Sequence, residues 1–515
     1  MRRFLRVLFS RYTISAIFIL LYLAVLAYFI FYFSVYSLFF FICATAVSIV
    51  VWLQIINRDI NPEVKLTWLA VVMAVPLFGC AIYLILNSRS LHRKESRLMG
   101  SIFDKLRSDE EEKDRGNEAL KGLAAESSSL AGYAHAILRD DSLSELYVGA
   151  DAEYYHSGEE FYSALLSCLR QAKRFIFIET FIICEGKMWS GIHEILKEKA
   201  ALGVEVCLLY DDVGSMKGVS AHFDKELCRE GIKCERFGRI TPRLVATHNN
   251  RDHRKIAVID GEAAFTGGIN IADEYINEKK RFGHWKDGGI RIGGDAVRGF
   301  TRLFLSLWCY TERSSEVPEE YLSRELPRSE GKDGFMIPYG SGPAPIYPVP
   351  VCKNMLMGMI NGAQSYVFIT TPYLIIDYDL TEALRSAAAR GVDVRIITPG
   401  IPDKRMVNVM TKSSYPRLIE AGVRIFEYTP GFIHEKSIVA DGEVAAVGTV
   451  NFDYRSLIHH YECGVWLARC SVISDVRDGF FKTLEHSTEI TPEAAKLGLG
   501  KKIAKNLVRI FAPLM

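Results

Sequence analysis

Charged side chains are absent between Arg11 and Arg58, in a chain of 515 residues with a net charge of +1. The near-zero net charge argues against the broadly basic surface typical of nucleic-acid-binding proteins, so no nucleic-acid partner is expected. The cysteines form no C-x-x-C pair and no spacing typical of a zinc site. They therefore indicate reduced thiols in a cytosol-facing protein and predict no metal centre. A chain of this length predicts two to four domains.

The uncharged stretch makes the N-terminal segment different from the rest of the chain. Residues 14–53 are nearly all apolar or aromatic. They are long enough for two membrane-spanning helices of about 20 residues each, with a turn expected near residues 34–37. Residues 66–86 form a third uncharged run. We therefore expect residues 1–90 to form an all-α transmembrane anchor of two to three helices, not a cleaved signal peptide.

Basic residues occur on both sides of these runs, at Arg2, Arg3, Arg6, Arg11, Arg58, Lys65, Arg89, Arg93, Lys94 and Arg97. Basic flanks favour the cytoplasmic side of a membrane, and three full spans cannot place all of them there. The orientation and the choice between two and three spans stay open. The next segment, residues 91–130, contains SDEEEKDRG and AESSSLAG and predicts a charged linker that buries little core.

The remainder of the chain contains an internal repeat. Residues 172–183 (AKRFIFIETFII) match residues 363–375 (AQSYVFITTPYLI), and residues 203–212 (GVEVCLLYDD) match residues 391–400 (GVDVRIITPG). Apolar periodicity in the first copy predicts strands at 175–183 and 204–210 and a helix at 189–201. This order predicts an α/β fold with a largely parallel sheet in each of two halves, residues 131–325 and 326–490. The two halves are expected to form one body with pseudo-twofold symmetry.

Each half carries one His-x-Lys-x4-Asp motif, HRKIAVIDG from His253 and HEKSIVADG from His434. Each motif predicts a strand that ends in an Asp-Gly turn. Alternation along a strand places the His of each motif on the same face as its Lys, which is Lys255 or Lys436. Two further residues, Asp260 and Asp441, fall on the turns. Asp before Gly in a hairpin is more often structural than catalytic, but we group both with the catalytic residues.

Pairing the two copies about the pseudo-twofold axis predicts a single shared site. Asn270 and Asn451 each follow the His of their motif by 17 residues, beyond a glycine-containing turn. We expect both amides to reach the same cleft and to bind phosphate. Two ammonium groups and two amides match the oxygens of one phosphate. Two imidazoles suit a nucleophile and a general acid.

Each imidazole also needs an orienting partner on its far nitrogen. Asp287, in WKDGGIRI, follows His253 by 34 residues, and Glu462, in HHYECGVWL, follows His434 by 28 residues. Each is a lone acid that enters an apolar strand, and we expect each to orient the His of its own half. A solvated acid at a strand end is the alternative.

These residues resemble the signature of the phospholipase D superfamily, H-x-K-x4-D followed by a G-[GS]-x-x-N element. The residues matched are His253, Lys255, Asp260 and Asn270 in the first copy and His434, Lys436, Asp441 and Asn451 in the second. More narrowly, the chain resembles the bacterial cardiolipin synthases from about residue 58 onward. The segments that carry this narrower resemblance are NPEVKLTWLAVVMAVPLFGCAIYL, YYHSGEEFYSALL, ETFIICEGKMW, YDDVGS, ITTPYLI and NFDYRSL.

The resemblance implies a two-step phosphatidyl transfer between two phosphatidylglycerol molecules, giving cardiolipin and glycerol. One His forms a phosphatidyl-histidine and the other acts as acid and then base; by analogy these are His253 and His434, in that order. Lysines and asparagines hold the phosphoryl oxygens, so no metal or nucleotide cofactor is implied. The expected location is the bacterial cell membrane, as a multi-pass protein, and the sequence does not give the oligomeric state.

A lipid substrate is also indicated by the C-terminal residues 491–515, which alternate Lys501, Lys502, Lys505 and Arg509 with apolar positions. They predict a basic amphipathic helix that lies on anionic lipid; a helix packed on the body is the alternative. The motifs leave open a phospholipase D that uses water or a phosphatidylserine synthase-type transferase, because the acceptor depends on the pocket. A nuclease and a catalytically silent scaffold are disfavoured by the neutral charge and by the two intact motifs.

Overall fold

The computed structural model describes residues 20–28, 34–86, 89–138, 143–149, 151–239, 249–322, 333–344 and 346–495. The described residues divide into two compact units, one that ends at Arg89 and one that begins at Ser90. The expected basic helix in residues 491–515 lies outside the described residues from position 496 onward, after the short helix α18 (Pro492–Ala495).

The described part of the N-terminal unit consists of helices. Residues 20–28 are helical, and α3 (Ser34–Ile56), α4 (Pro62–Ala74) and α5 (Pro76–Leu86) follow. Apolar side chains of α3, α4 and α5 share a small core, in which the rings of Trp68 and Tyr83 meet edge to face at 5.4 Å. Among the described residues, no helix combines the length and the apolar character needed to cross a membrane.

Two details of the expected anchor are wrong. Residues 34–37, where a turn was expected, belong to α3. The run at residues 66–86 is not one helix, because it divides between α4 and α5 at Pro76. Proline has no N–H to donate and its ring clashes with the preceding turn, which ends α4 at this point.

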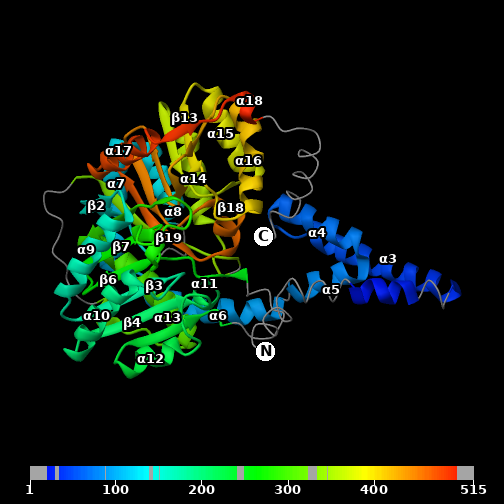
Figure 1. Cartoon of the computed structure of the whole chain (residues 1–515), viewed down its shortest axis with the longest axis horizontal. Helices are drawn as coiled ribbons and strands as arrows, with labels where there is room; N and C mark the ends of the chain where they lie inside the picture. The colour runs from blue at the N-terminus through cyan, green and yellow to red at the C-terminus, as the bar shows by residue number, and fades with distance from the viewer. Residues whose placement is uncertain are drawn as a thin grey trace. The chain divides into compact units, whose positions relative to one another are not determined.

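The second unit, drawn in Figure 1 with helices around its strands, contains two large sheets that share one strand order. The first-half sheet has the order β2 (Ala152–Tyr155), β9 (Gly289–Gly293), β7 (Ala263–Gly267), β6 (Ile256–Ile259), β3 (Phe175–Thr180), β4 (Glu205–Asp211) and β5 (Lys233–Phe237). The second-half sheet has the order β1 (Tyr147–Val148), β10 (Phe335–Ser341), β19 (Glu462–Ala468), β17 (Val444–Gly448), β16 (Ser437–Ala440), β11 (Tyr366–Thr370), β13 (Asp393–Pro399), β14 (Arg424–Tyr428) and β20 (Ser487–Glu489). Apart from the edge strands β1 and β20, the two orders correspond strand for strand, which confirms the repeat.

Each sheet is mixed, so the expectation of a largely parallel sheet is wrong. Only β3, β4 and β5 run parallel in the first half, and only β11, β13 and β14 in the second. The His-x-Lys strands β6 and β16 pair antiparallel with β3 and β11 and return through tight turns to β7 and β17. A tight turn can join only antiparallel neighbours, which fixes this part of each sheet.

Side-chain alternation divides the body into layers. Phe175 and Phe177 of β3 and Phe368 of β11 point into a core common to both halves, while the residues between them face separate outer cores. The common core also holds α6 (Arg89–Leu106), α13 (Val297–Glu312) and α17 (Val472–Leu484). The outer helices of the first half are α9 (Gly158–Gln171), α10 (Lys187–Ala201) and α12 (Phe223–Arg229). Those of the second half, on the other side of the body in Figure 1, are α14 (Val351–Gly362), α15 (Tyr378–Ala389) and α16 (Arg405–Glu420).

Short elements complete the described chain: α11 (Asp212–Ser215), η2 (Asp273–Ile276), β8 (His284–Lys286), η3 (Gly294–Ala296), η4 (Glu319–Tyr321), β12 (Leu374–Ile375), β15 (Gly431–Ile433), β18 (Phe452–Asp453) and η5 (Arg455–His459). The strands β8 and β15 come from different halves and pair in parallel directly before Asp287 and His434.

The expectation of a linker at residues 91–130 is wrong. These residues form α6, α7 (Glu110–Glu126) and the start of α8 (Ser128–Ile137), and Ile102 and Phe103 lie in the common core. The charged residues form the solvent faces of amphipathic helices, so a high charge content did not prevent burial of the opposite faces. In addition, β1 pairs with β10 and α8 packs on α14, so both α8 and β1 lie with the second half and not the first.

A buried ion pair fixes α7 to the body. Both terminal nitrogens of Arg302, Nη1 and Nη2, donate to the Glu112 carboxylate, Nη1 at 2.9 Å, and Tyr147 donates to the same carboxylate at 2.7 Å. The Glu112 side chain is 2% exposed. Replacement Glu112→Ala leaves a buried unpaired guanidinium and should lower the free energy of unfolding by about 3–5 kcal/mol. Denaturant unfolding in detergent micelles measures this loss.

The matched control is Glu111, whose pair with Arg115 is 2.9 Å long but whose side chain is 80% exposed. Glu111→Ala should change stability by no more than about 0.5 kcal/mol, because exposed helix pairs contribute little. Equal effects of the two replacements would show that α7 is not held by the buried pair.

Candidate active site

The two His-x-Lys motifs occupy equivalent places in the two sheets. His253 and Lys255 directly precede β6, and His434 and Lys436 directly precede β16. All four side chains belong to buried residues. Because the amino end of β16 pairs with the carboxyl end of β11, the His and Lys residues lie at the carboxyl edge of the parallel strands. This is the edge at which open α/β sheets place their ligands.

The aspartates of the motifs lie at the opposite ends of β6 and β16. Asp260 and Asp441 have φ values of 56° and 55°, and each is followed by a glycine with φ near 70°, as a tight hairpin turn requires. The Asp260 carboxylate accepts from the backbone N–H groups of residues 173, 174 and 175 at 2.7–2.9 Å. That of Asp441 accepts from residues 364, 365 and 366 at 2.7–2.8 Å. The structure therefore separates both aspartates from the imidazoles and gives them a structural role, contrary to their grouping with the catalytic residues.

His253 is oriented by residues of the second half. Its backbone N–H donates to the carbonyl oxygen of Tyr461 at 3.0 Å. Its Nδ1 lies 3.0 Å from a carboxylate oxygen of Glu462, which also accepts from the Thr449 hydroxyl. With the proton on Nδ1, the Nε2 nitrogen keeps a free lone pair.

His434 repeats this arrangement in the first half. Its backbone N–H donates to the carbonyl oxygen of Lys286 at 2.7 Å. Its Nδ1 lies 2.8 Å from one oxygen of Asp287, whose other oxygen accepts from the backbone N–H of Gly288 at 2.9 Å. Each imidazole is therefore oriented by a buried carboxylate, as a His that acts through Nε2 requires.

Asp287 and Glu462 are thus hydrogen-bonded to imidazoles, but not to those expected. The expectation that each acid pairs with the His of its own half is wrong: Glu462 pairs with His253 and Asp287 with His434. Sequence distance suggested the nearer His. The pseudo-twofold axis instead places the carboxylate-bearing strand of each half against the motif of the other half.

Both motif lysines lie beside the imidazoles, and the pKa of each lysine is lowered. The ammonium group of each donates to the carbonyl oxygen of the preceding His, at 2.6 Å for Lys255. Burial lowers the pKa of Lys255 to about 8. Burial, together with repulsion from Lys255, lowers the pKa of Lys436 to about 7 despite the attraction of Asp287. The two ammonium groups repel each other, so we expect an anion to bind between them and offset this repulsion.

The imidazoles are neutral in the free protein near pH 7. Burial lowers the pKa of His434 to about 4, with repulsion from Lys436 opposing the attraction of Asp287. Burial and the charges of Lys255 and Lys436 lower the pKa of His253 well below its usual range. Burial alone raises the pKa of Asp287, but His434 and Lys436 outweigh it and the net pKa is lowered. A bound anion would offset the repulsion from the lysines and make an imidazole easier to protonate.

The two asparagines differ in their surroundings. The Asn270 carbonyl oxygen accepts from the Ile182 N–H at 3.1 Å, and its amide donates to the Tyr275 hydroxyl at 2.6 Å. The Tyr275 ring lies 5.4 Å from the His434 ring, so Asn270 borders the site through this tyrosine. Asn451 is buried, and its carbonyl oxygen has no hydrogen-bond partner within the part of the chain that the structure describes.

The middle residue of each motif also reaches into the opposite half. Arg254 donates to the Tyr347 hydroxyl at 2.7 Å. Glu435 accepts from the Lys286 ammonium at 2.6 Å and from the Tyr154 hydroxyl at 2.5 Å. Sequence reasoning missed these residues, because nothing in the motif pattern distinguishes a middle residue that bonds across the body from a solvent-facing one.

His460 is a further residue that sequence reasoning missed. It is buried, its ring lies 5.4 Å from the His253 ring, and its Nδ1 is 3.7 Å from the second oxygen of Glu462. Its spacing of two from Glu462 on an extended segment could have revealed it, because such residues share a face. His253, His460 and Glu462 offer ligand atoms within 4.8 Å of one another, a spacing that could hold a metal ion. The lysine ammoniums beside His253 favour an anion there over a dication.

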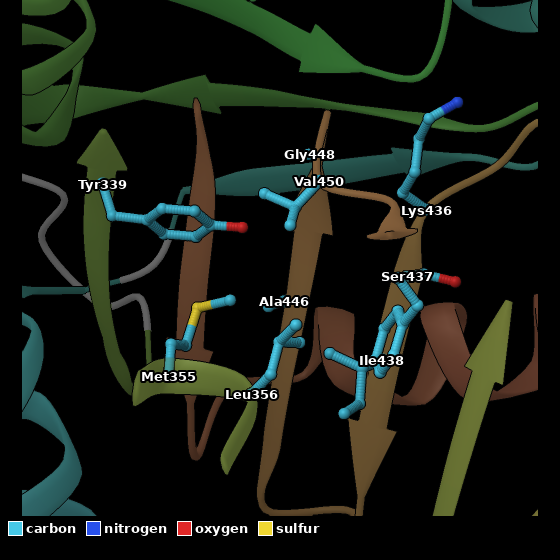
Figure 2. Close-up of a pocket in the computed structure, with 10 residues that line it drawn as sticks. Tyr339, Met355, Leu356, Lys436, Ser437, Ile438, Ala446, Gly448 and Val450 are labelled. Atoms are coloured by element: carbon cyan, nitrogen blue, oxygen red, sulfur yellow. The ribbon is translucent and has the colours of Figure 1, made fainter. Parts of the chain in front are cut away.

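A small cavity lies beneath the second motif (Figure 2). Its volume is about 10 Å³, and its lining includes Tyr339, Met355, Leu356 and Ile438, with Lys436 at one side. Figure 2 shows the ammonium group of Lys436 pointing away from these side chains. The space is enough for about one water molecule, so this cavity does not accommodate an acyl chain.

Comparison with known proteins agrees with this site. The family model described as "Cardiolipin synthase, PLD-like domain" matches residues 165–281 and 356–484, and the model "Phospholipase_D-nuclease N-terminal" matches residues 46–86. The chain is 37% identical over 464 residues to an uncharacterized protein of Streptococcus mutans, covering 90% of this chain and 99% of the relative. It is 34% identical over 460 residues to a cardiolipin synthase of Alkalihalophilus pseudofirmus, covering 88% and 90%.

The fold is also similar to the crystal structure of phosphatidylserine synthase from Haemophilus influenzae, with a TM-score of 0.55 at 13% identity, covering 72% of this chain and 95% of that one. The duplicated fold, the paired motifs and the cardiolipin synthases among the relatives define a phospholipase D-like phosphatidyltransferase. Within that class, the chain belongs to the cardiolipin synthase family.

Proposed function

We propose that the chain joins two phosphatidylglycerol molecules into cardiolipin and glycerol, with His253 as nucleophile and His434 as acid and base. The observation that carries this proposal is the crossed pairing of the two imidazoles with Glu462 and Asp287 beside two buried lysines. Cardiolipin synthases among the relatives supply the substrate class. The lysines and Asn451 would bind the phosphoryl oxygens.

In the first step, Nε2 of His253 attacks the phosphorus and the bond from phosphorus to the glycerol headgroup breaks. His434, protonated once the anionic lipid is bound, gives its proton to the departing glycerol oxygen. In the second step, neutral His434 takes a proton from a hydroxyl of a second phosphatidylglycerol. That oxygen attacks the phosphorus, the phosphorus–nitrogen bond breaks, and cardiolipin leaves with His253 restored. No net proton is gained or lost.

The same proposal places the protein in the bacterial cell membrane as a multi-pass protein. The support is the uncharged sequence between Arg11 and Arg58 and the similarity of residues 46–86 to an N-terminal family segment. Residues 1–90 would anchor the protein, and the two halves would form the catalytic body. Anchoring keeps the site near substrates that reside in a bilayer.

A product measurement tests the reaction. Purified full-length protein is given phosphatidylglycerol as the sole lipid in mixed micelles with EDTA, and the products are identified by mass spectrometry. Cardiolipin with an equimolar amount of glycerol is the expected result. Phosphatidic acid as the only product would identify water as the acceptor and overturn the proposed synthesis.

The lysine environment predicts a fall in activity at alkaline pH. Phosphate binding requires the ammonium forms, and the pKa values of Lys436 and Lys255 are lowered to about 7 and about 8. The value of kcat/KM should therefore decrease as pH rises through this range, by up to about tenfold per pH unit for each lysine that must be charged. Initial rates between pH 6 and pH 9.5 measure it, provided that chemistry limits the rate.

Lys436→Arg provides the control. Its guanidinium stays charged throughout this range. The Lys436→Arg variant should be less active than the parent, and its kcat/KM should begin to fall at a higher pH. A kcat/KM that stays constant up to pH 9.5 in the parent protein would contradict the role given to the lysines.

A further inference from the structure

The loop after β13 borders the active-site edge of the second half. This loop joins β13 to α16, and the backbone N–H of Ile401 donates to the carbonyl oxygen of Gly431 at 3.1 Å. Gly431 begins β15, three residues before His434. The start of α16, which follows this loop at Arg405, therefore lies near the edge of the site.

A segment of the first half meets this loop at the same place. Gly283 forms an isolated bridge with Gly431, and the residues before it, Lys279, Lys280 and Arg281, are exposed. The strand β8 follows and leads to Asp287. Both halves thus contribute to one rim, which consists of Lys279, Lys280, Arg281, Ile401, Lys404, Arg405, Met406 and Val409 and is called the mouth rim below.

The mouth rim combines exposed apolar and basic side chains. Ile401, Met406 and Val409 are 40%, 60% and 51% exposed. Exposed apolar side chains that gather within a rim of polar residues are typical of an interaction site. The five remaining members are Lys or Arg, all of them exposed.

The acids nearby are already engaged. Asp403 accepts from the Tyr373 hydroxyl at 2.7 Å and lies 3.8 Å from the Lys404 ammonium, and Glu278 pairs with Lys187 at 2.5 Å. Glu274 lies 3.5 Å from Arg281. Two of the five rim cations, Arg281 and Lys404, are paired with these acids. Lys279, Lys280 and Arg405 still leave the rim with a net positive charge around apolar side chains.

We propose that the mouth rim seats on the surface of an anionic lipid bilayer, with Ile401, Met406 and Val409 inserted among the acyl chains. This inference rests on the proposed function, because that function requires lipid headgroups to enter the site, and a docked rim would give them a route. Basic residues that surround exposed apolar ones match the chemistry of an anionic membrane interface. The placement at the joint of the two halves brings the bilayer surface to both imidazoles at once.

Photo-crosslinking tests the contact without requiring turnover. The photoreactive residue p-benzoylphenylalanine replaces Met406 in the full-length protein, which is placed in nanodiscs that contain phosphatidylglycerol or only phosphatidylcholine. After irradiation, lipid adducts on the peptide are measured by mass spectrometry. Adducts should be at least about fivefold more abundant in the anionic nanodiscs, because the basic members bind anionic lipid.

The matched control places the same residue at Leu202, which is 70% exposed and lies before β4, at the opposite edge of the first sheet. Adducts at Met406 no more abundant than at Leu202 would overturn the proposal, as would equal yields in the two kinds of nanodisc. Because adduct formation does not depend on catalysis, a protein that makes no cardiolipin can still give either result. The two proposals therefore fail separately.

Activity gives a second readout. The combined replacements Ile401→Ser, Met406→Ser and Val409→Ser should lower cardiolipin formation from phosphatidylglycerol vesicles by about tenfold or more, mainly through KM. With a short-chain phosphatidylglycerol kept monomeric, the loss should be less than about twofold, because no interface has to be bound. Leu202→Ser should match the parent on both substrates. Equal losses on vesicles and on monomers would place the damage in the site itself and overturn the docking role.

Discussion

Replacing either His253 or His434 by alanine should abolish cardiolipin formation, although the two residues belong to separate halves and separate sheets. If His253 forms the covalent bond to phosphorus and His434 moves the proton, neither imidazole can substitute for the other. The expected loss is at least about 10³-fold in kcat for each variant. Turnover of phosphatidylglycerol in mixed micelles measures it.

The two variants should differ in what they still do. His434→Ala retains the nucleophile, so a phosphatidyl donor with a good leaving group should still label His253, detectable as a mass increase on that peptide. His253→Ala should give no label. Substantial turnover in either variant would contradict a single shared site, and a label in His253→Ala but not in His434→Ala would reverse the roles.

The second large effect is expected at the crossed carboxylates. Asp287→Asn and Glu462→Gln keep the shape of each side chain but replace an acceptor oxygen by an N–H donor, which favours the wrong imidazole tautomer. Each variant should lose about 10²–10⁴-fold in kcat with little change in KM, because an orienting carboxylate acts mainly in the transition state. Steady-state kinetics on phosphatidylglycerol separates the two parameters.

A conservative change elsewhere serves as the control. Glu443 lies on the turn between β16 and β17 and pairs with Arg469 at 3.1 Å, with its side chain 49% exposed. Glu443→Gln should leave kcat and KM unchanged. If Asp287→Asn and Glu462→Gln retain full kcat, the hydrogen bonds to His434 and His253 are not part of the mechanism.

Local patterns in the sequence predicted the repeat and the site residues that lie close in sequence. The apolar runs around Phe175 and Tyr366 and the two Asp-Gly turns depend on neighbouring residues, and they form the expected strands and hairpins. The lysines follow their histidines by two residues, so strand geometry alone placed them together. Asp287 and Glu462 were identified as imidazole partners because each is a lone acid that enters an apolar strand.

The contacts that could not be predicted join residues far apart in the chain. The pairing of His253 with Glu462 spans 209 residues, and that of Glu435 with Tyr154 spans 281. No local pattern tells which half supplies a partner, because both halves contain suitable acids at similar spacing. The helices α6 and α7 were missed because charged residues dominate their composition. Only a few apolar residues, such as Ile102, pack them against the core.

The crossed anchoring of the two histidines has a consequence for the origin of the chain. One half alone would hold its imidazole with an unoriented Nδ1, and the missing carboxylate would come from an identical copy related by a twofold axis. The crossed contacts between the halves therefore resemble those of an isologous homodimer, as a fusion of two such subunits would produce. In a homodimer the two contact surfaces have the same sequence, whereas in one chain the two surfaces can differ. One carboxylate is now Asp287, bound by a backbone N–H, and the other is Glu462, bound by a threonine hydroxyl, so the two imidazoles are free to specialise.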